Sequence, residues 1–459
     1  MPTVPREELE IRRIVLLRLE GGVREVFLRC ESTGLILPQV LVARAERVAP
    51  QLAAQIQQTC GVKAVSVFSL EAEYELMEVC ERPAQVPKDS RWVAIGSLVE
   101  SSFSDRYDFQ VVQTMFAQSS TENSNKFRGP FAYLDWFGDL RRWVEREIRA
   151  YGLHLTGEFN QLNACPTFSL IRLETDGPAV WFKAVGKPNL REYALTLALS
   201  QSCSAFLPSI LGSHAEWNGW LTREVEGSLL DANSVSIAWE AVARDLAALQ
   251  IHSLGRALPL LDLDARDLRV SALANRAEPF FEAMREVFEQ QTKIQPPRLS
   301  RHELRHLSVR VLDALAVLDG TKFPDALGHL DLNPGNIVCS SGGSKFLDWA
   351  EGFVGHPFLT FEYLGEHFRH TFGGENPEQS RLLTCYLFPW RTLIAEREIL
   401  CALKASPLVA VFAAGVSSDV WTNRRKLGEP RAAGYLRSLV RRMQREANAF
   451  QDRSLTCLN

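Results

Sequence analysis

One stretch of the chain constrains its fold more than any other. It is His329-Leu-Asp-Leu-Asn-Pro-Gly-Asn336, and two short β-prone runs follow it, Ile337–Cys339 and Lys345–Leu347. The residues between the two runs are serines and glycines, which favour a turn. The pattern therefore predicts a β-hairpin directly after the stretch that ends at Asn336.

Folding this hairpin about Gly342 places residue 337 opposite residue 347, and Asn336 opposite Asp348. An amide oxygen and a carboxylate would then meet at the open end of the hairpin. Mg2+ prefers oxygen ligands and usually binds through one or two carboxylates together with substrate phosphates. We therefore expect Asn336 and Asp348 to hold a magnesium ion.

The spacing His-x-Asp-x-x-x-x-Asn, with a second aspartate beyond the hairpin, resembles the catalytic loop of the aminoglycoside phosphotransferases and their relatives, the choline and homoserine kinases. The resemblance implies a protein-kinase-like fold in which Asp331 is the catalytic base and His329 braces the loop. It also implies Mg2+ at Asn336 and Asp348, with ATP or GTP as the phosphoryl donor.

The segment Gly355-His-Pro357 also resembles this family, which has Gly-x-Pro after the metal-binding aspartate. The family usually has a further aspartate three residues after the proline, whereas this chain has Thr360. We expect this departure to weaken an internal support of the loop rather than the chemistry itself.

Upstream, Lys183 lies in the apolar run Val180–Val185, and Glu192 lies in the first turn of a predicted helix. Because a buried ammonium group needs a partner, the two residues are expected to pair. In the resembled family this pair holds the α- and β-phosphates of the nucleotide. The alternative is an exposed lysine on an edge strand.

Two further segments are candidates for the nucleotide side of the site. The segment Trp220–Gly227 resembles the hinge between kinase lobes, which implies that backbone groups at Glu224 and Val225 contact the nucleobase. No glycine-rich Gly-x-Gly-x-x-Gly motif precedes it, and Gly157–Asn163 is the candidate for the loop that covers the phosphates.

The bulk composition excludes some classes of protein. The 459 residues carry a net charge of -4 and give no sign of a nucleic-acid partner. The longest apolar run, Pro407–Gly415, is expected to be too short to span a membrane. Nine scattered cysteines without a Cys-x-x-Cys pair, and an N-terminus without a secretory signal, predict a cytoplasmic protein.

The chain is expected to have an α+β architecture, in which a bilobal protein-kinase-like fold follows a separate α/β domain. The predicted segments are residues 1–116 for this N-terminal domain of unclear role, 117–130 for a linker, 131–227 for a β-rich small lobe and 228–459 for a helical large lobe.

A competing signal is His302-Glu-Leu-Arg-His306, which has the His-Glu-x-x-His spacing of zinc proteases. On a helical wheel the two histidines fall opposite the apolar stripe formed by Leu304, Leu307 and Val311. They are therefore expected to face solvent, and a zinc site is the less favoured reading.

Together these features predict a phosphotransferase that moves the γ-phosphoryl group of a nucleoside triphosphate to a hydroxyl of a small molecule. The alternative is a catalytically degenerate pseudokinase that serves as a binding or scaffold module. The sequence does not define the acceptor or the oligomeric state. Glu351, Glu362 and Glu366 are candidates for contacts with a cationic acceptor, although no dense acidic cluster is present.

Overall fold

The computed structural model describes residues 9–81, 87–119, 129, 131–165, 167–231, 235–374, 377–418 and 420–456. The chain divides into two compact units. Unit 1 comprises residues 1–193 and 209–224, and unit 2 comprises residues 194–208 and 225–459. Unit 1 includes the predicted N-terminal domain and most of the predicted small lobe, and the division into four segments stays a prediction.

Unit 1 begins with a seven-stranded sheet whose central path has the order β3-β2-β1-β6-β5, while β4 pairs with β1 and β7 pairs with β2. Strands β1 and β6 run parallel, and the other pairs run antiparallel. The strands are β1 (Leu9–Glu20), β2 (Val23–Glu31), β3 (Gly34–Ile36), β4 (Gln39–Ala43), β5 (Ala64–Leu70), β6 (Tyr74–Val79) and β7 (Ser90–Ala94).

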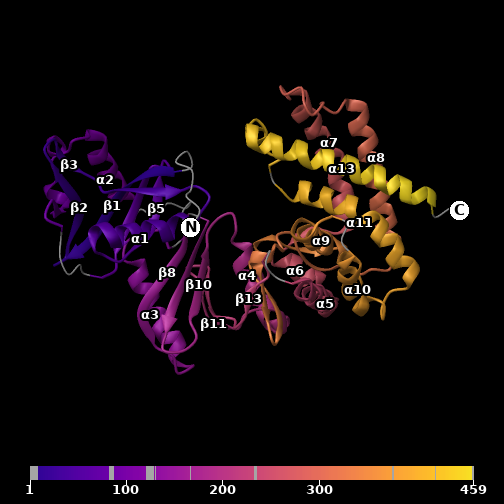
Figure 1. Cartoon of the computed structure of the whole chain (residues 1–459), viewed down its shortest axis with the longest axis horizontal. Coiled ribbons are helices and arrows are strands. Elements are labelled where there is room, and N and C mark those ends of the chain that lie inside the picture. The colour runs from indigo at the N-terminus through magenta and orange to yellow at the C-terminus, as the bar shows by residue number, and fades with distance from the viewer. Residues whose placement is uncertain are drawn as a thin grey trace. The chain divides into compact units, whose positions relative to one another are not determined.

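Helices α1 (Val48–Cys60) and α2 (Arg106–Ser119) lie beside this sheet (Figure 1). Alternation along β1 explains the arrangement, because Ile14 and Leu16 join the cluster that contains α1, while Val15 and Leu17 join the cluster that contains α2. The predicted linker overlaps the end of α2 at residues 117–119, whereas residues 120–128 and 130 lie outside the described residues.

The second sheet of unit 1 is antiparallel, with the order β11-β12-β10-β9-β8. Its strands are β8 (Leu155–Cys165), β9 (Phe168–Thr175), β10 (Val180–Val185), β11 (Ile210–His214) and β12 (Gly219–Arg223). Helix α3 (Trp136–Arg149) buries one apolar stripe, including Leu140, Val144 and Ile148, in the same cluster as the sheet residues Phe182 and Leu221. Helix α4 (Arg191–Ser202) begins at the end of unit 1.

Unit 2 is mainly helical (Figure 1). It is built around one large hydrophobic cluster. Its main helices are α5 (Ser236–His252), α6 (Ala257–Asp262), α7 (Val270–Glu289), α8 (Arg301–Asp319), α9 (Phe358–Phe372), α10 (Glu378–Trp390), α11 (Glu396–Ser417), α12 (Arg424–Leu427) and α13 (Pro430–Thr456). Its two small sheets have the orders β13-β16-β17 and β14-β18-β15. The strands are β13 (Ser228–Leu229), β14 (Arg266–Leu268), β15 (Ala326–His329), β16 (Ile337–Ser340), β17 (Gly343–Phe346) and β18 (Gly352–Gly355).

Helix α11 corrects the expectation that no apolar run is long enough to span a membrane. Its 22 residues are long and apolar enough to do so by length and composition, and it is the one such helix in the described part of the chain. About 61% of its most apolar window is buried inside the structure. Buried residues such as Ile399, Leu408 and Phe412 belong to the core cluster of unit 2, which is also the pattern of a core helix.

Candidate active site

The loop that follows β15 is anchored by His329, whose side chain is buried. The Nδ1 atom of His329 accepts a hydrogen bond from the Asp331 N–H at 3.0 Å, and Nε2 lies 3.0 Å from the Leu347 carbonyl oxygen. Because Nδ1 accepts, Nε2 carries the proton and donates it to Leu347. Burial lowers the pKa of His329, which favours this neutral tautomer. The ring therefore ties the loop to the hairpin strand.

Thr360 was expected to weaken an internal support of the loop, but in the structure it forms a supporting hydrogen bond. Its fully buried hydroxyl oxygen accepts a hydrogen bond from the His329 backbone N–H at 2.9 Å. Helix α9, which carries Thr360, starts directly after Pro357 at the end of β18. At that point Gly355 is required, because an added Cβ would lie 2.5 Å from the Leu268 carbonyl oxygen. A threonine hydroxyl thus satisfies the loop N–H without a buried charge.

The carboxylate of Asp331 is held by three neutral donors. Oδ1 accepts from Asn333 Nδ2 at 3.0 Å and from the Tyr363 hydroxyl at 3.1 Å. Oδ2 receives a longer contact of 3.4 Å from Asn336 Nδ2. Within the described ranges Asp331 forms no ion pair with lysine or arginine. Its orientation is therefore fixed while its negative charge is not neutralised by a cation of the chain.

A short 3-10 helix, Pro334–Asn336, gives the loop its shape. Asn333 caps this helix, because its Oδ1 accepts the Gly335 N–H at 2.9 Å while its Nδ2 donates to Asp331. One asparagine therefore fixes both the turn and the aspartate that precedes it.

The predicted hairpin is present, but its predicted register is wrong by one residue. Ile337 pairs with Phe346, and Ser340 pairs with Gly343, so that the turn contains two residues instead of closing symmetrically about Gly342. Gly343 has a φ of 100°, a conformation that glycine adopts readily. As a result the backbone N–H of Leu347, rather than that of Asp348, donates a hydrogen bond to the Asn336 carbonyl oxygen at 2.8 Å.

Asp348 follows the hairpin directly and has a φ of 60°, in the left-handed region, which turns the chain into the 3-10 helix Trp349–Glu351. Asn336 donates through Nδ2 to the Asp331 carbonyl oxygen at 2.8 Å, so its Oδ1 is the atom left to face a metal. An amide oxygen and a carboxylate form a suitable partial donor set for Mg2+. No group of three or more His, Cys, Asp or Glu side chains that could hold a metal occurs among the described residues. Water and substrate phosphate oxygens usually complete the coordination of Mg2+ in such sites.

In unit 1 the structure brings Lys183 and Glu192 together. The Lys183 Nζ donates to Glu192 Oε1 at 2.5 Å, and the two side chains are 13% and 2% exposed. The ammonium group also lies 5.4 Å from the centre of the Phe168 ring. The alternative of an exposed edge-strand lysine is wrong, because β10 lies between β9 and β12.

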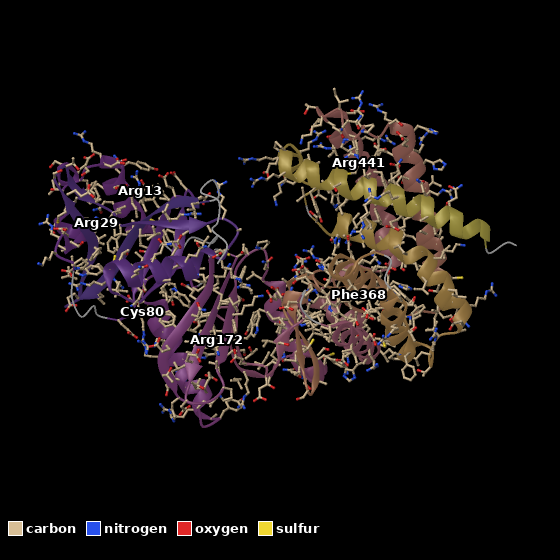
Figure 2. All side chains as sticks on the ribbon, in the orientation of Figure 1. Arg13, Arg29, Cys80, Arg172, Phe368 and Arg441 are labelled. Atoms are coloured by element: carbon tan, nitrogen blue, oxygen red, sulfur yellow. The ribbon has the colours of Figure 1, made fainter. Side chains whose placement is uncertain are left out.

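Glu224 and Val225 occupy the point at which the chain leaves unit 1 and enters unit 2. The Glu224 carboxylate accepts from Arg172 (Figure 2) at 2.7 and 2.8 Å, and its N–H donates to the Ala179 carbonyl oxygen at 2.9 Å. The N–H is thus already bonded, and a contact with a nucleobase at Glu224 would use its carbonyl group.

Two other expectations have clear outcomes. The candidate phosphate loop Gly157–Asn163 is wrong, because these residues form part of strand β8 and several of them pair with β9. The predicted solvent-facing position of His302 and His306 is confirmed. Glu303 between them forms a capping box with Ser300 at the start of α8, which gives this glutamate a structural role.

Sequence reasoning missed three residues that shape the site. Asn333 and Tyr363 orient Asp331, and Asp245 of α5 accepts hydrogen bonds from the Ser344 N–H and hydroxyl at 2.8 and 2.6 Å. Asn333 lies inside the motif, and its Asn-Pro-Gly context is a turn signal that indicates a cap. Tyr363 and Asp245 carry no local signal, because their contacts depend on the tertiary fold.

Comparison with known proteins gives a family match over the part of the chain that contains this loop. The model of the phosphotransferase enzyme family matches residues 191–379. The predicted resemblance to the aminoglycoside phosphotransferases is confirmed for this region. The predicted α+β class is confirmed by the structure, which has a sheet-rich N-terminal part and a helical C-terminal part. No curated protein matches the chain.

Several solved structures are similar to the chain at low sequence identity. A choline kinase from Cryptosporidium parvum is 13% identical, with a TM-score of 0.47, and the match covers 69% of this chain and 97% of that one. An ethanolamine kinase from Plasmodium vivax is 14% identical, with a TM-score of 0.45 and coverages of 76% and 91%. An aminoglycoside 2'-phosphotransferase-IIIa is 14% identical, with a TM-score of 0.45 and coverages of 66% and 96%.

Proposed function

We propose that this protein is a small-molecule phosphotransferase that moves the γ-phosphoryl group of ATP or GTP to a hydroxyl of its acceptor. The observation that carries the proposal is the Asp331 carboxylate, which is oriented by neutral donors that include Asn336, in the region that matches the phosphotransferase family. An aspartate in this state can accept a proton from an attacking hydroxyl.

In the proposed reaction Asp331 orients the acceptor hydroxyl and takes its proton as the oxygen attacks the γ-phosphorus. The bond between the γ-phosphorus and the β–γ bridging oxygen breaks, and the nucleoside diphosphate leaves. Asn336 Oδ1 and Asp348 would hold Mg2+, which when bound supplies charge neutralisation at the phosphates. Lys183, oriented by Glu192, is proposed to bind nucleotide phosphates, and the main chain at Glu224 and Val225 to contact the base. Most of the rate gain would come from positioning and charge.

Three glutamates are candidates for contacts with a cationic acceptor, but their contacts in the structure favour a different kind of substrate. Glu351 accepts from Arg266 at 2.9 Å, Glu366 pairs with Arg442, and Glu362 accepts from the Ser406 hydroxyl at 2.8 Å. Two of the three charges are thus balanced by arginines of the chain. An uncharged or singly charged hydroxyl compound fits this arrangement better than a polycation.

The test is nucleotide consumption by the purified chain with Mg2+ against a panel of sugars, amino alcohols and hydroxy acids. We expect turnover with at least one acceptor, and loss of that turnover in Asp331→Ala. Turnover that survives in Asp331→Ala would contradict the assignment. A chain that binds no nucleotide and turns over no acceptor would instead support the pseudokinase alternative.

A further inference from the structure

We propose that Tyr363 is a positioning residue for the phosphoryl-transfer reaction, whose hydroxyl fixes Asp331 so that Oδ2 is the oxygen that receives the acceptor's proton. This inference rests on the proposed role of Asp331 as the base. Tyr363 lies on α9, 32 residues beyond Asp331 in the sequence, and its hydroxyl reaches Oδ1 at 3.1 Å.

The two oxygens of the Asp331 carboxylate have unequal surroundings. Oδ1 accepts from both Tyr363 and Asn333, at 3.1 and 3.0 Å, which uses its two lone-pair directions. Oδ2 has one contact, of 3.4 Å, from Asn336, which is at the long end of a hydrogen bond. An incoming hydroxyl therefore finds its acceptor at Oδ2, and rotation of the carboxylate would break two bonds.

Helix α9 holds the loop at two points, one turn apart. Thr360 accepts from the backbone N–H of His329, and Tyr363 donates to the side chain of Asp331. Because residues three apart on a helix lie on the same face, both contacts are set by one rigid element. The Tyr363 ring also packs edge-on against His367, with 4.8 Å between the ring centres. The hydroxyl therefore has little freedom to leave Asp331.

The chemistry of the tyrosine supports a donor role. Burial, followed by the charge of Asp331, raises the pKa of Tyr363. The phenol therefore keeps its proton throughout the neutral range and can only donate to the carboxylate. A lysine or arginine in this position would also orient Asp331, but it would compete with the proton that the base must accept.

The experiment compares Tyr363→Phe with the wild type and with Asp331→Ala, using the acceptor identified in the substrate panel. Removal of the hydroxyl is expected to lower kcat roughly 10-fold, because one charge-assisted hydrogen bond to the base is lost. The KM for the nucleotide and the melting temperature are expected to stay close to the wild-type values.

Tyr386→Phe is the matched control, since Tyr386 also donates through its hydroxyl within unit 2, to Gln250 Oε1 at 2.8 Å. That change should lower the melting temperature while kcat per folded molecule is kept. A purely structural role for Tyr363 would give the same pattern as Tyr386→Phe, and this result would overturn the proposal.

The other outcomes distinguish a failure of this inference from a failure of the proposed function. A wild-type chain without turnover, or an active Asp331→Ala variant, overturns both. An active wild type and an inactive Asp331→Ala, together with an unchanged kcat in Tyr363→Phe, overturn only the role of Tyr363. Peptide mass analysis after incubation with Mg2+ and nucleotide should show no phosphoryl group on Tyr363. A phosphorylated Tyr363 would make it an acceptor and contradict the positioning role.

Discussion

Two aspartates of this chain each accept a hydrogen bond from a tyrosine, one in each unit, but only one of them is also paired with an arginine. In unit 1 the buried Asp108 accepts from the Tyr74 hydroxyl at 2.9 Å and from Arg13 (Figure 2) at 2.7 Å. In unit 2 Asp331 accepts from the Tyr363 hydroxyl at 3.1 Å and, within the described part of the chain, its other donors are asparagine side chains.

The presence or absence of an arginine partner separates a structural carboxylate from one that is available to a ligand. The charge of Asp108 is neutralised by the chain itself, and the arginine links α2 to strand β1. The carboxylate of Asp331 is oriented by hydrogen bonds but is not paired with an arginine, so it stays available to a proton or to a nearby cation. We infer that the lack of an arginine partner, rather than the number of hydrogen bonds, marks the functional aspartate.

Glu75 in unit 1 shows that a second condition is needed. It has a close neutral donor, the Ser69 hydroxyl at 2.6 Å, but it is only 2% exposed. Burial raises the pKa of Glu75 from 4.5 to about 7. Unlike the nearly fully buried Glu75, Asp331 keeps some exposure to solvent.

The largest expected effect is that of Asp331→Asn on activity. The amide keeps an oxygen acceptor for Tyr363 but cannot take the acceptor's proton, so kcat should fall by roughly 10²–10⁴-fold. Steady-state kinetics and a thermal melt measure the two consequences. A melting temperature that falls as far as in an Asp108 variant would break the distinction between the two aspartates.

Glu75→Gln should make unit 1 more stable at pH 8 by on the order of 2–3 kcal/mol, because the buried charge is removed. In the wild type the folded pKa lies above the unfolded one. The stabilisation from the protonated group is therefore complete below about pH 4.5 and is lost as the pH rises to about 7. Urea unfolding between pH 4 and 8 checks this. An equally steep slope in the glutamine variant would count against it.

Asp108→Asn should lower the free energy of unfolding by about 2 kcal/mol, because a hydrogen bond from Arg13 to a charged group is weakened in a buried setting. The measurement is chemical denaturation, with phosphoryl transfer per folded molecule as the control. If turnover fell while stability was kept, Asp108 would have to be reclassified as functional.

Thr360→Val should give the smallest effect, a loss of about 1–2 kcal/mol in stability, because the buried N–H of His329 loses its acceptor. Thr360→Ser retains the hydroxyl and serves as the control, which should stay closer to the wild type in a melt. Equal melting temperatures for the valine and serine variants would show that the hydrogen bond contributes nothing.

The sequence predicted the hairpin, the helix that contains Glu192 and the helix that carries His302 and His306, because these depend on local patterns. The register of the hairpin was wrong, since it depends on Gly343 adopting a positive φ, which the serine- and glycine-rich turn does not reveal. The apolar run Pro407–Gly415 was expected to be too short to span a membrane, whereas Pro407 lies inside the longer apolar helix α11.

Contacts between distant segments could not be predicted in the same way. Tyr363 reaches Asp331, and Asp245 reaches Ser344 across 99 residues, only after the helices have packed. Lys183 and Glu192 were predicted correctly as partners because a charged residue in an apolar strand requires a nearby opposite charge. The free-energy cost of burying an unpaired charge therefore predicted an interaction partner better than proximity in the sequence did.

Nucleotide binding tests the central claim most directly, namely that the loop from Asp331 to Asp348 is a site for magnesium and a nucleoside triphosphate. The measurement is calorimetric titration of ATP and of GTP into wild type, Asp331→Ala and Asp348→Ala, with and without Mg2+. We predict Mg2+-dependent binding that persists in Asp331→Ala and is strongly weakened in Asp348→Ala. Equal affinities for all three proteins, or affinities that do not depend on Mg2+, would contradict the account.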